Sequence, residues 1–488
     1  MYPRTRIALI VLSLCSSISP TLAAESSKSW PSSADYTEPY QQEALQIHQD
    51  TVAMRTALGH GKVPEMAEYL ADKFRKAGFA STDVKVIPFE VPGGEVTASL
   101  VVRYPGDGSL EKKPVLLMAH MDIVDALPED WERDPFTLIE EDGYLFGRGS
   151  VDDKIGTTLI TSAFLRLKRE GFVPGRDFII AFTGDEETGM LNVRVLANQF
   201  RSLVDAEFAL NADGGGGILS EDGMPLSYTV QTAEKTYASF TFTIRNPGGH
   251  SSLPRKDNAI YELADLLKNI QELEFPVRHN ATTLRAFELM AETTPDPAGD
   301  MMARFAKNPE DAEAAAALSE DPGMVGNLRT TCVATMLNGG HAENALPQSA
   351  SATVNCRIFP GVEVDAVKQA LVEAIDNESV EVEVLGDPRA GPASPLLDEV
   401  FGAITRTVHV QYPGLPVVPV QVPYATDGRE TRLAGIPTYG TLGIFLWPGE
   451  MFAHGLNERV RVKSFYDGLE HWYLLLKDLG AQPETQSD

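Results

Sequence analysis

Three short apolar runs of the sequence, 114–119, 178–183 and 206–212, are each followed closely by ionisable residues. These residues are His120 and Asp122 after the first run, Asp185, Glu186 and Glu187 after the second, and Asp213 after the third. Continuous apolar runs of this length are typical of strands that are buried on both faces of a parallel sheet. Because ligands of open α/β sheets bind at the carboxyl ends of the strands, we expect the three clusters to meet in one crevice.

A divalent metal site is the chemistry that this combination favours. Carboxylates gathered in one crevice repel one another, and a bound cation removes that repulsion. Imidazole nitrogen and carboxylate oxygen suit Zn²⁺, and less exclusively Mn²⁺ or Co²⁺. The chain has three cysteines and no CxxC pair, which excludes a closed structural zinc site made of thiolates. It also lacks the HExxH motif of thermolysin-like proteases and the Gly-x-Ser-x-Gly motif of serine hydrolases.

The elements that must position these residues follow from the spacing of apolar residues. Helical periodicity over 41–78 and 157–169, alternating with the buried runs, predicts an α/β fold with a mainly parallel sheet and flanking helices. The same pattern returns from 391 and ends in a helix near 464–479. One sheet is therefore expected to bring these distant ionisable residues together.

A segment with a different pattern interrupts this α/β fold. It begins with strict alternation of apolar and polar residues, as in a half-buried strand, and it follows the ferredoxin-like order βαββαβ. Its elements are expected at 236–245, 258–270, 328–337, 350–358, 363–376 and 378–385. A further helical insertion is expected at 295–322, and the sequence leaves its role open.

The N-terminus has the features of a secretion signal. Arg4 and Arg6 form a basic start, residues 7–14 form an apolar run too short to span a bilayer, and small residues lead to Ala23. We expect cleavage after Ala23 or Ala24, and a secreted or periplasmic protein that does not associate with a membrane afterwards. An uncleaved membrane anchor is the alternative. The predicted division is a signal peptide at 1–23, a catalytic domain at 24–234 and 387–488, and an inserted lid or dimerisation domain at 235–386.

Length, composition and charge agree with this organisation. A chain of 488 residues is expected to form two or three domains, and 43% hydrophobic residues exclude a disordered chain. The formal net charge is −28 and no basic cluster stands out, which argues against a nucleic-acid partner.

Two of the cysteines lie in the predicted smaller domain. Cys332 and Cys356 occupy β-like runs and are equally distant from Asn344, so an antiparallel pair that turns there would bring them face to face. In an exported protein such a pair can form a disulfide. Two buried free thiols are the alternative, and the sequence does not decide between them.

Several motifs of the chain, taken in order, resemble the M20 metallopeptidases, a family of dizinc carboxypeptidases, aminoacylases and dipeptidases. The motifs are HMD at 120–122, GRGSVDDK at 147–154, GDEETG at 184–189, Asp213, GGHSSLP at 248–254 and His454. The resemblance covers nearly the whole mature chain. The motifs are most similar to those of the carboxypeptidase S, or Gly-X carboxypeptidase, branch. It implies a zinc exopeptidase-like catalytic fold with the ferredoxin-like domain inserted in it.

The resemblance also implies a ligand set for two Zn²⁺ ions per chain, with Co²⁺ or Mn²⁺ as alternatives. His120 and Asp213 would hold one ion, Glu187 and His454 would hold the other, and Asp152 would bridge the two. It makes Asp153 a non-ligand and implies a cis peptide bond between Asp152 and Asp153.

Further roles come from the same resemblance. Glu186 would be the general base that takes a proton from a metal-bridging water, and Asp122 would fix the orientation of His120. His250 would reach the active site of a partner subunit and stabilise the oxyanion there, which predicts a homodimer. The substrate would be bound by Asn344, Arg357, Thr426 and Asp427.

The function predicted in this way is hydrolysis of the C-terminal peptide bond of small peptides. Hydrolysis of N-acyl amino acids by the same chemistry is the nearest alternative. A non-catalytic exported binding protein on the same scaffold is the alternative from another class. The sequence does not decide the preferred side chain or the native metal.

Overall fold

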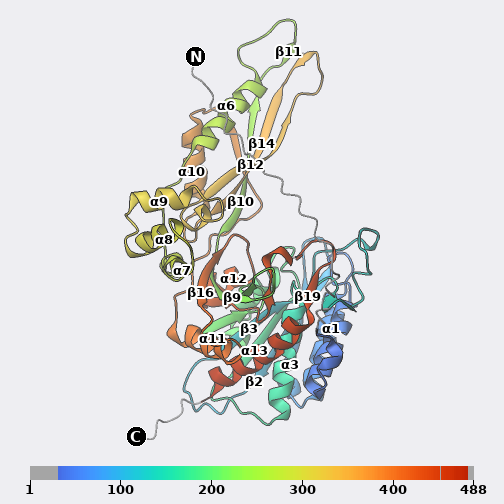
Figure 1. The fold of residues 1–488 in the computed structure, drawn as a ribbon. Helices are drawn as coiled ribbons and strands as arrows, with labels where there is room; N and C mark the ends of the chain where they lie inside the picture. Colours follow the sequence, from blue (N-terminus) through green and yellow to red (C-terminus); the bar gives the residue numbers. More distant parts are fainter. Residues whose placement is uncertain (1–30, 451, 482–488) are drawn as a thin grey trace, which may run out of the picture.

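The computed structural model describes residues 31–450 and 452–481 (Figure 1). The predicted signal peptide at 1–23 lies outside these residues. Two sheets dominate the structure, a large one in the lower part of Figure 1 and a smaller one above it. No helix among the described residues is long and apolar enough to cross a membrane.

The large sheet has ten strands in the order β1-β2-β6-β3-β7-β17-β9-β8-β18, with β16 paired to β9. Its strands are β1 (Val84–Glu90), β2 (Val96–Tyr104), β3 (Val115–His120), β6 (Phe178–Thr183), β7 (Phe208–Asn211), β8 (Gly216–Leu219), β9 (Pro225–Glu234), β16 (Val417–Val422), β17 (Thr438–Gly440) and β18 (Phe445–Leu446). The central strands β6, β3, β7 and β17 are parallel, and β1 and β2 add an antiparallel edge. The predicted α/β fold with a mainly parallel sheet is confirmed.

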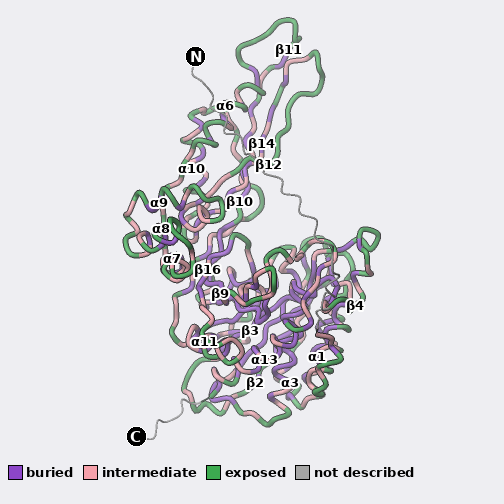
Figure 2. The backbone as a smooth tube through the Cα atoms, viewed as in Figure 1, coloured by how far each residue is buried: buried purple, intermediate pink, exposed green. Residues whose placement is uncertain are grey.

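Both faces of this sheet are covered, which explains why its central strands are apolar throughout. In β6, Phe178, Ile180 and Phe182 join one buried cluster, whereas Ile179 and Ala181 join the cluster on the opposite face. The first face is covered by α1 (Pro39–Val52), α2 (Val63–Lys76), α3 (Lys154–Arg169), α11 (Asp398–Gln411) and α13 (Val462–Gly480). The second face is covered by the shorter α4 (Leu191–Asn198), α5 (Arg201–Val204) and α12 (Gly428–Leu433). Figure 2 shows the buried residues concentrated in these layers.

The smaller sheet has the order β12-β14-β10-β15 and all its neighbouring strands are antiparallel. Its elements are β10 (Thr236–Arg245), α6 (Ala259–Glu272), β12 (Thr331–Gly339), β14 (Ser349–Ile358), α10 (Val364–Ile375) and β15 (Glu381–Leu385). This succession and this strand order are those of the predicted ferredoxin-like arrangement. The domain bounds 235–386 remain our proposal.

The strands β12 and β14 of this sheet carry the two cysteines. Cys332 lies opposite Cys356 in the β12–β14 pairing, and the two are joined as a disulfide. At the far end of the sheet, the two-residue strands β11 (Gly249–His250) and β13 (Ala345–Leu346) pair with each other.

The predicted insertion at 295–322 is helical and belongs to a cluster of three helices. These are α7 (Ala281–Ala291), α8 (Ala298–Lys307) and α9 (Ala312–Ser319), packed around Phe287 and Phe305. The helix α7 rests on β16 of the large sheet, where Asn280 Nδ2 donates to Gln421 Oε1 at 3.1 Å.

A three-stranded sheet beside the large one brings distant loops together. It consists of β4 (Ile139–Glu141), β5 (Tyr144–Phe146) and β19 (Arg459–Arg461), with β5 in the middle. Because Phe146 pairs with Arg459, the chain after β5 runs beside the chain before β19. Asp152 and His454 lie in those two segments.

Candidate metal centre

The ionisable residues that follow the buried strands lie together in the structure. The strands β3, β6 and β7 are parallel neighbours, so their carboxyl ends share one edge of the sheet. Potential ligand atoms of His120, Glu186 and Asp213 lie within 4.8 Å of one another, and so do those of His120, Asp152 and Glu187. These two groups share His120 and form one cluster.

Asp152 lies between two imidazoles. Its Oδ1 is 2.9 Å from His120 Nε2, and its Oδ2 is 3.1 Å from His454 Nε2. The same His454 nitrogen is 3.0 Å from Glu187 Oε1. A carboxylate with each oxygen directed to a different nitrogen has the geometry of a ligand that two ions could share.

Asp153 turns away from this cluster. The peptide bond between Asp152 and Asp153 is cis. Asp153 Oδ1 accepts a hydrogen bond from Gly156 N at 3.2 Å and so caps α3, while Oδ2 accepts one from His120 N at 3.3 Å.

The electrostatics of the cluster fit a site for cations. Burial, together with the charge of Asp213, raises the pKa of Glu186 well above its usual range, and burial does the same for the pKa of Asp213. Hydrogen bonds to Asp152 and Glu187 raise the pKa of His454 to about 10. Divalent ions of the Zn²⁺ type take such nitrogen and oxygen donors, and their charge would relieve the repulsion between the carboxylates.

Asp122 supports the cluster through its main chain and its carboxylate. His120 Nδ1 is 3.0 Å from the main-chain carbonyl oxygen of Asp122 and 3.7 Å from its Oδ1, so its closer partner in this residue is the carbonyl oxygen. The carboxylate instead accepts the main-chain N–H groups of Glu186 and Glu187, at 3.2 and 3.1 Å. Asp122 therefore holds the turn that presents both glutamates.

A cavity of about 380 Å³ opens at the cluster. Its lining joins the ligand-type residues to an aliphatic wall from β8, β16, β18 and the segment between β17 and β18. That wall consists of Ile218, Val420, Val422, Leu442, Ile444 and Leu446. The glycine tract beside it is tightly packed, since a Cβ on Gly215, which has a φ of 65°, would lie 2.4 Å from the carbonyl oxygen of Gly440.

Thr426 and Asp427 are buried and are not among the residues that line this cavity. Thr426 Oγ1 donates to Glu234 Oε1 at 2.7 Å, and Thr183 Oγ1 donates to Asp427 Oδ2. The cavity is lined instead by Tyr424 and Ala425 from the same loop. The role of Thr426 and Asp427 in substrate binding stays a prediction.

Of the other residues predicted to meet substrate, His250 and Asn344 lie at the far tip of the smaller sheet, whereas Arg357 contacts the loop that lines the cavity. His250 and Asn344 are exposed at the far tip of the smaller sheet, where Ser251 N donates to the carbonyl oxygen of Asn344 at 3.1 Å (Figure 1). Arg357 lies near the base of that sheet, and its Nη1 donates to the carbonyl oxygen of Pro423 at 2.5 Å.

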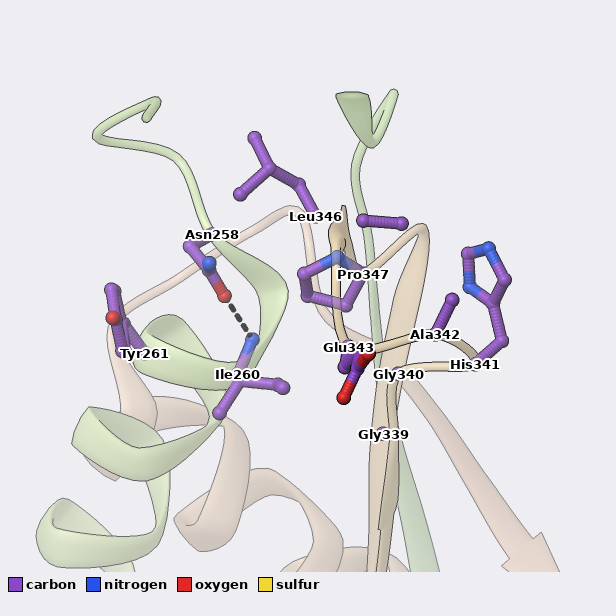
Figure 3. Close-up of a pocket in the computed structure, with 11 residues that line it drawn as sticks. Asn258, Ile260, Tyr261, Gly339, Gly340, His341, Ala342, Glu343, Leu346 and Pro347 are labelled. Carbon is purple, nitrogen blue, oxygen red and sulfur yellow. Dashed lines mark hydrogen bonds between the residues drawn. The ribbon is translucent and has the colours of Figure 1, made fainter. Parts of the chain in front are cut away.

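A second cavity lies at that tip and is different in kind. It measures about 660 Å³ and lies between the start of α6 and the loop 339–347 (Figure 3). His341 and Glu343 line it, but among the described residues no group of three metal-ligating side chains gathers there. We therefore assign the metal centre to the cluster at the large sheet.

Sequence reasoning missed two buried charges next to the cluster. Arg148 and Glu458 form an ion pair at 2.7 Å with side chains that are almost fully buried. Arg148 lies four residues before Asp152, and Glu458 lies four residues after His454. This closeness to two predicted ligands is the sequence feature that could have identified them.

Comparison with known proteins gives one family and several relatives. The model of Peptidase family M20/M25/M40 matches residues 116–478. The human N-fatty-acyl-amino acid synthase/hydrolase PM20D1 is 27% identical over 461 residues, which cover 90% of each chain. The probable carboxypeptidase S-like 2 of Dictyostelium discoideum is 26% identical over 78% of this chain and 74% of that protein. Among solved structures, the M20 family metallo-carboxypeptidase Sso-CP2 of Sulfolobus solfataricus has a TM-score of 0.66 at 18% identity, covering 90% of this chain and 99% of that one.

Proposed function

The chain belongs to peptidase family M20/M25/M40, a family of hydrolases, and from this premise we propose that it cleaves the amide bond that precedes a free C-terminal amino acid. The observation that carries the proposal is the cluster of His120, Asp152, Glu187, Asp213 and His454 at the edge of an apolar cavity.

The proposed ligands divide into two sets with one shared residue. His120 and Asp213 would hold one divalent ion, Glu187 and His454 would hold the other, and Asp152 would be shared by both. The ions would be Zn²⁺, or Co²⁺ or Mn²⁺, and would supply Lewis-acid polarisation of the amide carbonyl and a nucleophilic water at neutral pH.

Glu186 is the proposed general base. It lies in the cluster beside His120 and Asp213, and burial raises its pKa, so its carboxylate can take up a proton and pass it to the leaving amine. Asp122 keeps the Glu186 carboxylate in place by binding the main-chain N–H of the same residue.

The aliphatic wall of the cavity favours an apolar group on one side of the scissile bond. Burying each methylene of such a group contributes about 0.8 kcal/mol. We therefore propose N-acyl amino acids with aliphatic acyl chains as the first substrate class, in agreement with the name of the human relative. Peptides with an apolar residue before the C-terminal one are the second class, in agreement with the carboxypeptidase S-like relative.

A chelation experiment with a substrate panel tests this function. Purified protein is assayed by elemental analysis and by release of free amino acid, before and after chelation. The panel compares N-acyl amino acids of rising chain length, dipeptides with the same C-terminal residue, and versions with an amidated C-terminus. We expect two metal ions per chain, loss of hydrolysis on chelation, recovery with added Zn²⁺ or Co²⁺, and no cleavage of the amidated controls. Hydrolysis that survives complete metal removal would refute the proposal.

We further propose that the mature protein is exported and is a homodimer. The sequence features of residues 1–23 and the disulfide between Cys332 and Cys356 support export, because disulfides persist in oxidising compartments. The distance of His250 from the metal cluster of its own chain supports a dimer in which this residue serves the partner.

A further inference from the structure

A buried ion pair joins the two loops that carry Asp152 and His454. Arg148 Nη1 donates to Glu458 Oε2 at 2.7 Å, and the two side chains are 4% and 0% exposed. Arg148 follows β5 and Glu458 precedes β19, so the pair continues the contact made by the pairing of these two strands.

The Glu458 carboxylate also binds the backbone that leads to Asp152. Its Oε1 accepts the main-chain N–H groups of Gly149, Val151 and Asp152, at 3.1, 2.7 and 3.1 Å. Three donors on one oxygen fix the path of this short segment. The position from which the Asp152 side chain departs is fixed with it.

Arg148 reaches in the other direction, to the loop of His454. Its Nη2 donates to the carbonyl oxygen of Gly455 at 3.1 Å, directly after that histidine. Gly147 N donates to the carbonyl oxygen of Glu458 at 3.0 Å and closes the connection. His454 itself has a φ of 61°, a left-handed conformation that a non-glycine residue keeps only when its surroundings hold it.

We propose that Arg148 and Glu458 are positioning residues that set the affinity of the metal site formed by Asp152, Glu187 and His454. Neither side chain belongs to the cluster, and Glu458 binds Asp152 through its main-chain N–H. The pair fixes the separation of the two loops, and thereby the contact of His454 Nε2 with Asp152 Oδ2 at 3.1 Å. A buried ion pair is weak support for folding stability, because desolvation offsets most of the attraction. A role in holding the metal ligands in place explains why this buried ion pair lies beside the cluster.

The proposal rests on the proposed metal centre, and metal binding tests it without an activity assay. The variants are Glu458→Gln, which keeps the size of the side chain but offers one oxygen in place of two, and Arg148→Lys, which keeps the charge but cannot reach both Glu458 and Gly455. The matched control is Glu399→Gln, which alters another ion pair with a buried arginine, Arg176, at 2.8 Å, away from the cluster. Each chelated protein is titrated with Co²⁺ and with Zn²⁺ by equilibrium dialysis, and the visible absorption of Co²⁺ is recorded.

We expect the wild-type protein and Glu399→Gln to bind two ions with the same two dissociation constants. In Glu458→Gln and Arg148→Lys, one of the two steps should weaken by about 10–100-fold and the Co²⁺ spectrum of that step should change, as is typical when partners behind metal ligands are removed. Two wild-type binding steps in a folded Arg148→Lys or Glu458→Gln protein would overturn the proposal. Should Glu458→Gln fail to fold, Arg148→Lys decides. A wild-type protein that binds no metal would instead refute the metal centre itself.

Discussion

Glu186 and Glu187 are adjacent in the chain, yet the turn that carries them presents them to different parts of the cluster. Glu186 groups with His120 and Asp213, whereas Glu187 groups with His120 and Asp152. The Asp122 carboxylate binds both of their main-chain N–H groups and so fixes this division. The conformation of this short turn therefore decides which glutamate is available as a metal ligand and which as a general base.

The first prediction concerns Glu186. Replacing it by Gln keeps its shape and removes its ability to take up a proton, so kcat should fall by at least about 10²-fold, the lower end of what general base catalysis contributes. Metal content and thermal unfolding should stay at wild-type values, because Glu186 is not among the proposed ligands. A folded, metal-loaded Glu186→Gln protein with near wild-type kcat would contradict the assignment.

The cluster of ionisable residues could be anticipated from the sequence, but the wall of the cavity beside it could not. His120, Glu187 and Asp213 each follow a strand that its apolar run identifies, and parallel strands bring their carboxyl ends to one edge. The cavity wall has no such signal, because residues such as Ile218, Val420 and Leu446 are ordinary strand residues until the sheet order is known. Thr426 illustrates the same limit, since its position in the motif did not reveal that its hydroxyl binds the buried Glu234 and that it does not line the cavity.

Among the helices, α1 and α13 each contain one fully buried histidine, His48 in α1 and His471 in α13. Burial, with a smaller contribution from Lys154, lowers the pKa of His48 to about 3, and burial lowers the pKa of His471 to about 3. Both residues are neutral in the folded protein at pH 5, whereas an unfolded chain would protonate them below a pKa of about 6.5. Their folded-state pKa values are depressed, so the unfolded state binds more protons between about pH 6.5 and pH 3, and stability falls as the pH falls through that window.

The second prediction follows for His471. Between pH 7 and pH 5, this residue should cost the wild-type protein about 2 kcal/mol of unfolding free energy. In His471→Gln, the loss of stability between the two pH values should be smaller by that amount, whatever the change at pH 7. Urea unfolding of the chelated protein at both pH values measures it, since chelation removes the pH dependence of metal binding. The exposed His279→Gln serves as control, and an equal pH dependence in all three proteins would contradict the prediction.

The third prediction concerns the hairpin of β12 and β14. The disulfide closes a loop of 24 residues, so its reduction should lower the free energy of unfolding by about 3 kcal/mol. Thermal unfolding with and without reductant measures this, and the double variant Cys332→Ser with Cys356→Ser should not respond to reductant. A wild-type protein that is shown by mass spectrometry to be reduced, yet unfolds at an unchanged temperature, would contradict it.

Helices and strands with a long or strict pattern of apolar residues could be predicted from the sequence, whereas very short strands could not. The strand β6 covers the predicted run 178–183, and the expected facing of Cys332 and Cys356 agrees with the observed pairing. The three-residue strands β4, β5 and β19 contain too few residues to show a period, so the sheet that joins the loops of Asp152 and His454 had no sequence signal. It is this unpredicted sheet that brings Arg148 and Glu458 together.

In the whole molecule, the smaller sheet ends in two edge strands, β12 and β15. The strand β12 is the more apolar of the two on its exposed surface, since Val333, Met336 and Leu337 are 60%, 69% and 70% exposed. An exposed apolar edge strand is a surface that pairs readily with another chain. We infer that a second copy of the chain covers it, in line with the homodimer proposed above.

A dimer of this kind makes a sharp prediction about His250. In one chain this residue lies on β11 at the far tip of the smaller sheet, whereas the cluster begins at His120, the last residue of β3 in the large sheet (Figure 1). If His250 serves the active site of the partner, two inactive variants can complement each other. Glu186→Gln supplies an intact His250, and His250→Ala supplies an intact Glu186.

Mixing equal amounts of these two variants under conditions of subunit exchange should therefore restore activity. In a symmetric dimer, half of the molecules become mixed dimers with one complete site each, so about one quarter of the wild-type activity should return. Sedimentation of the same samples shows whether dimers are present, and Leu337→Lys on β12 should reduce both dimerisation and complementation because it places a charge on the proposed contact. Full activity in a monomeric species, or dimers that exchange subunits without regaining activity, would show that each chain completes its own site.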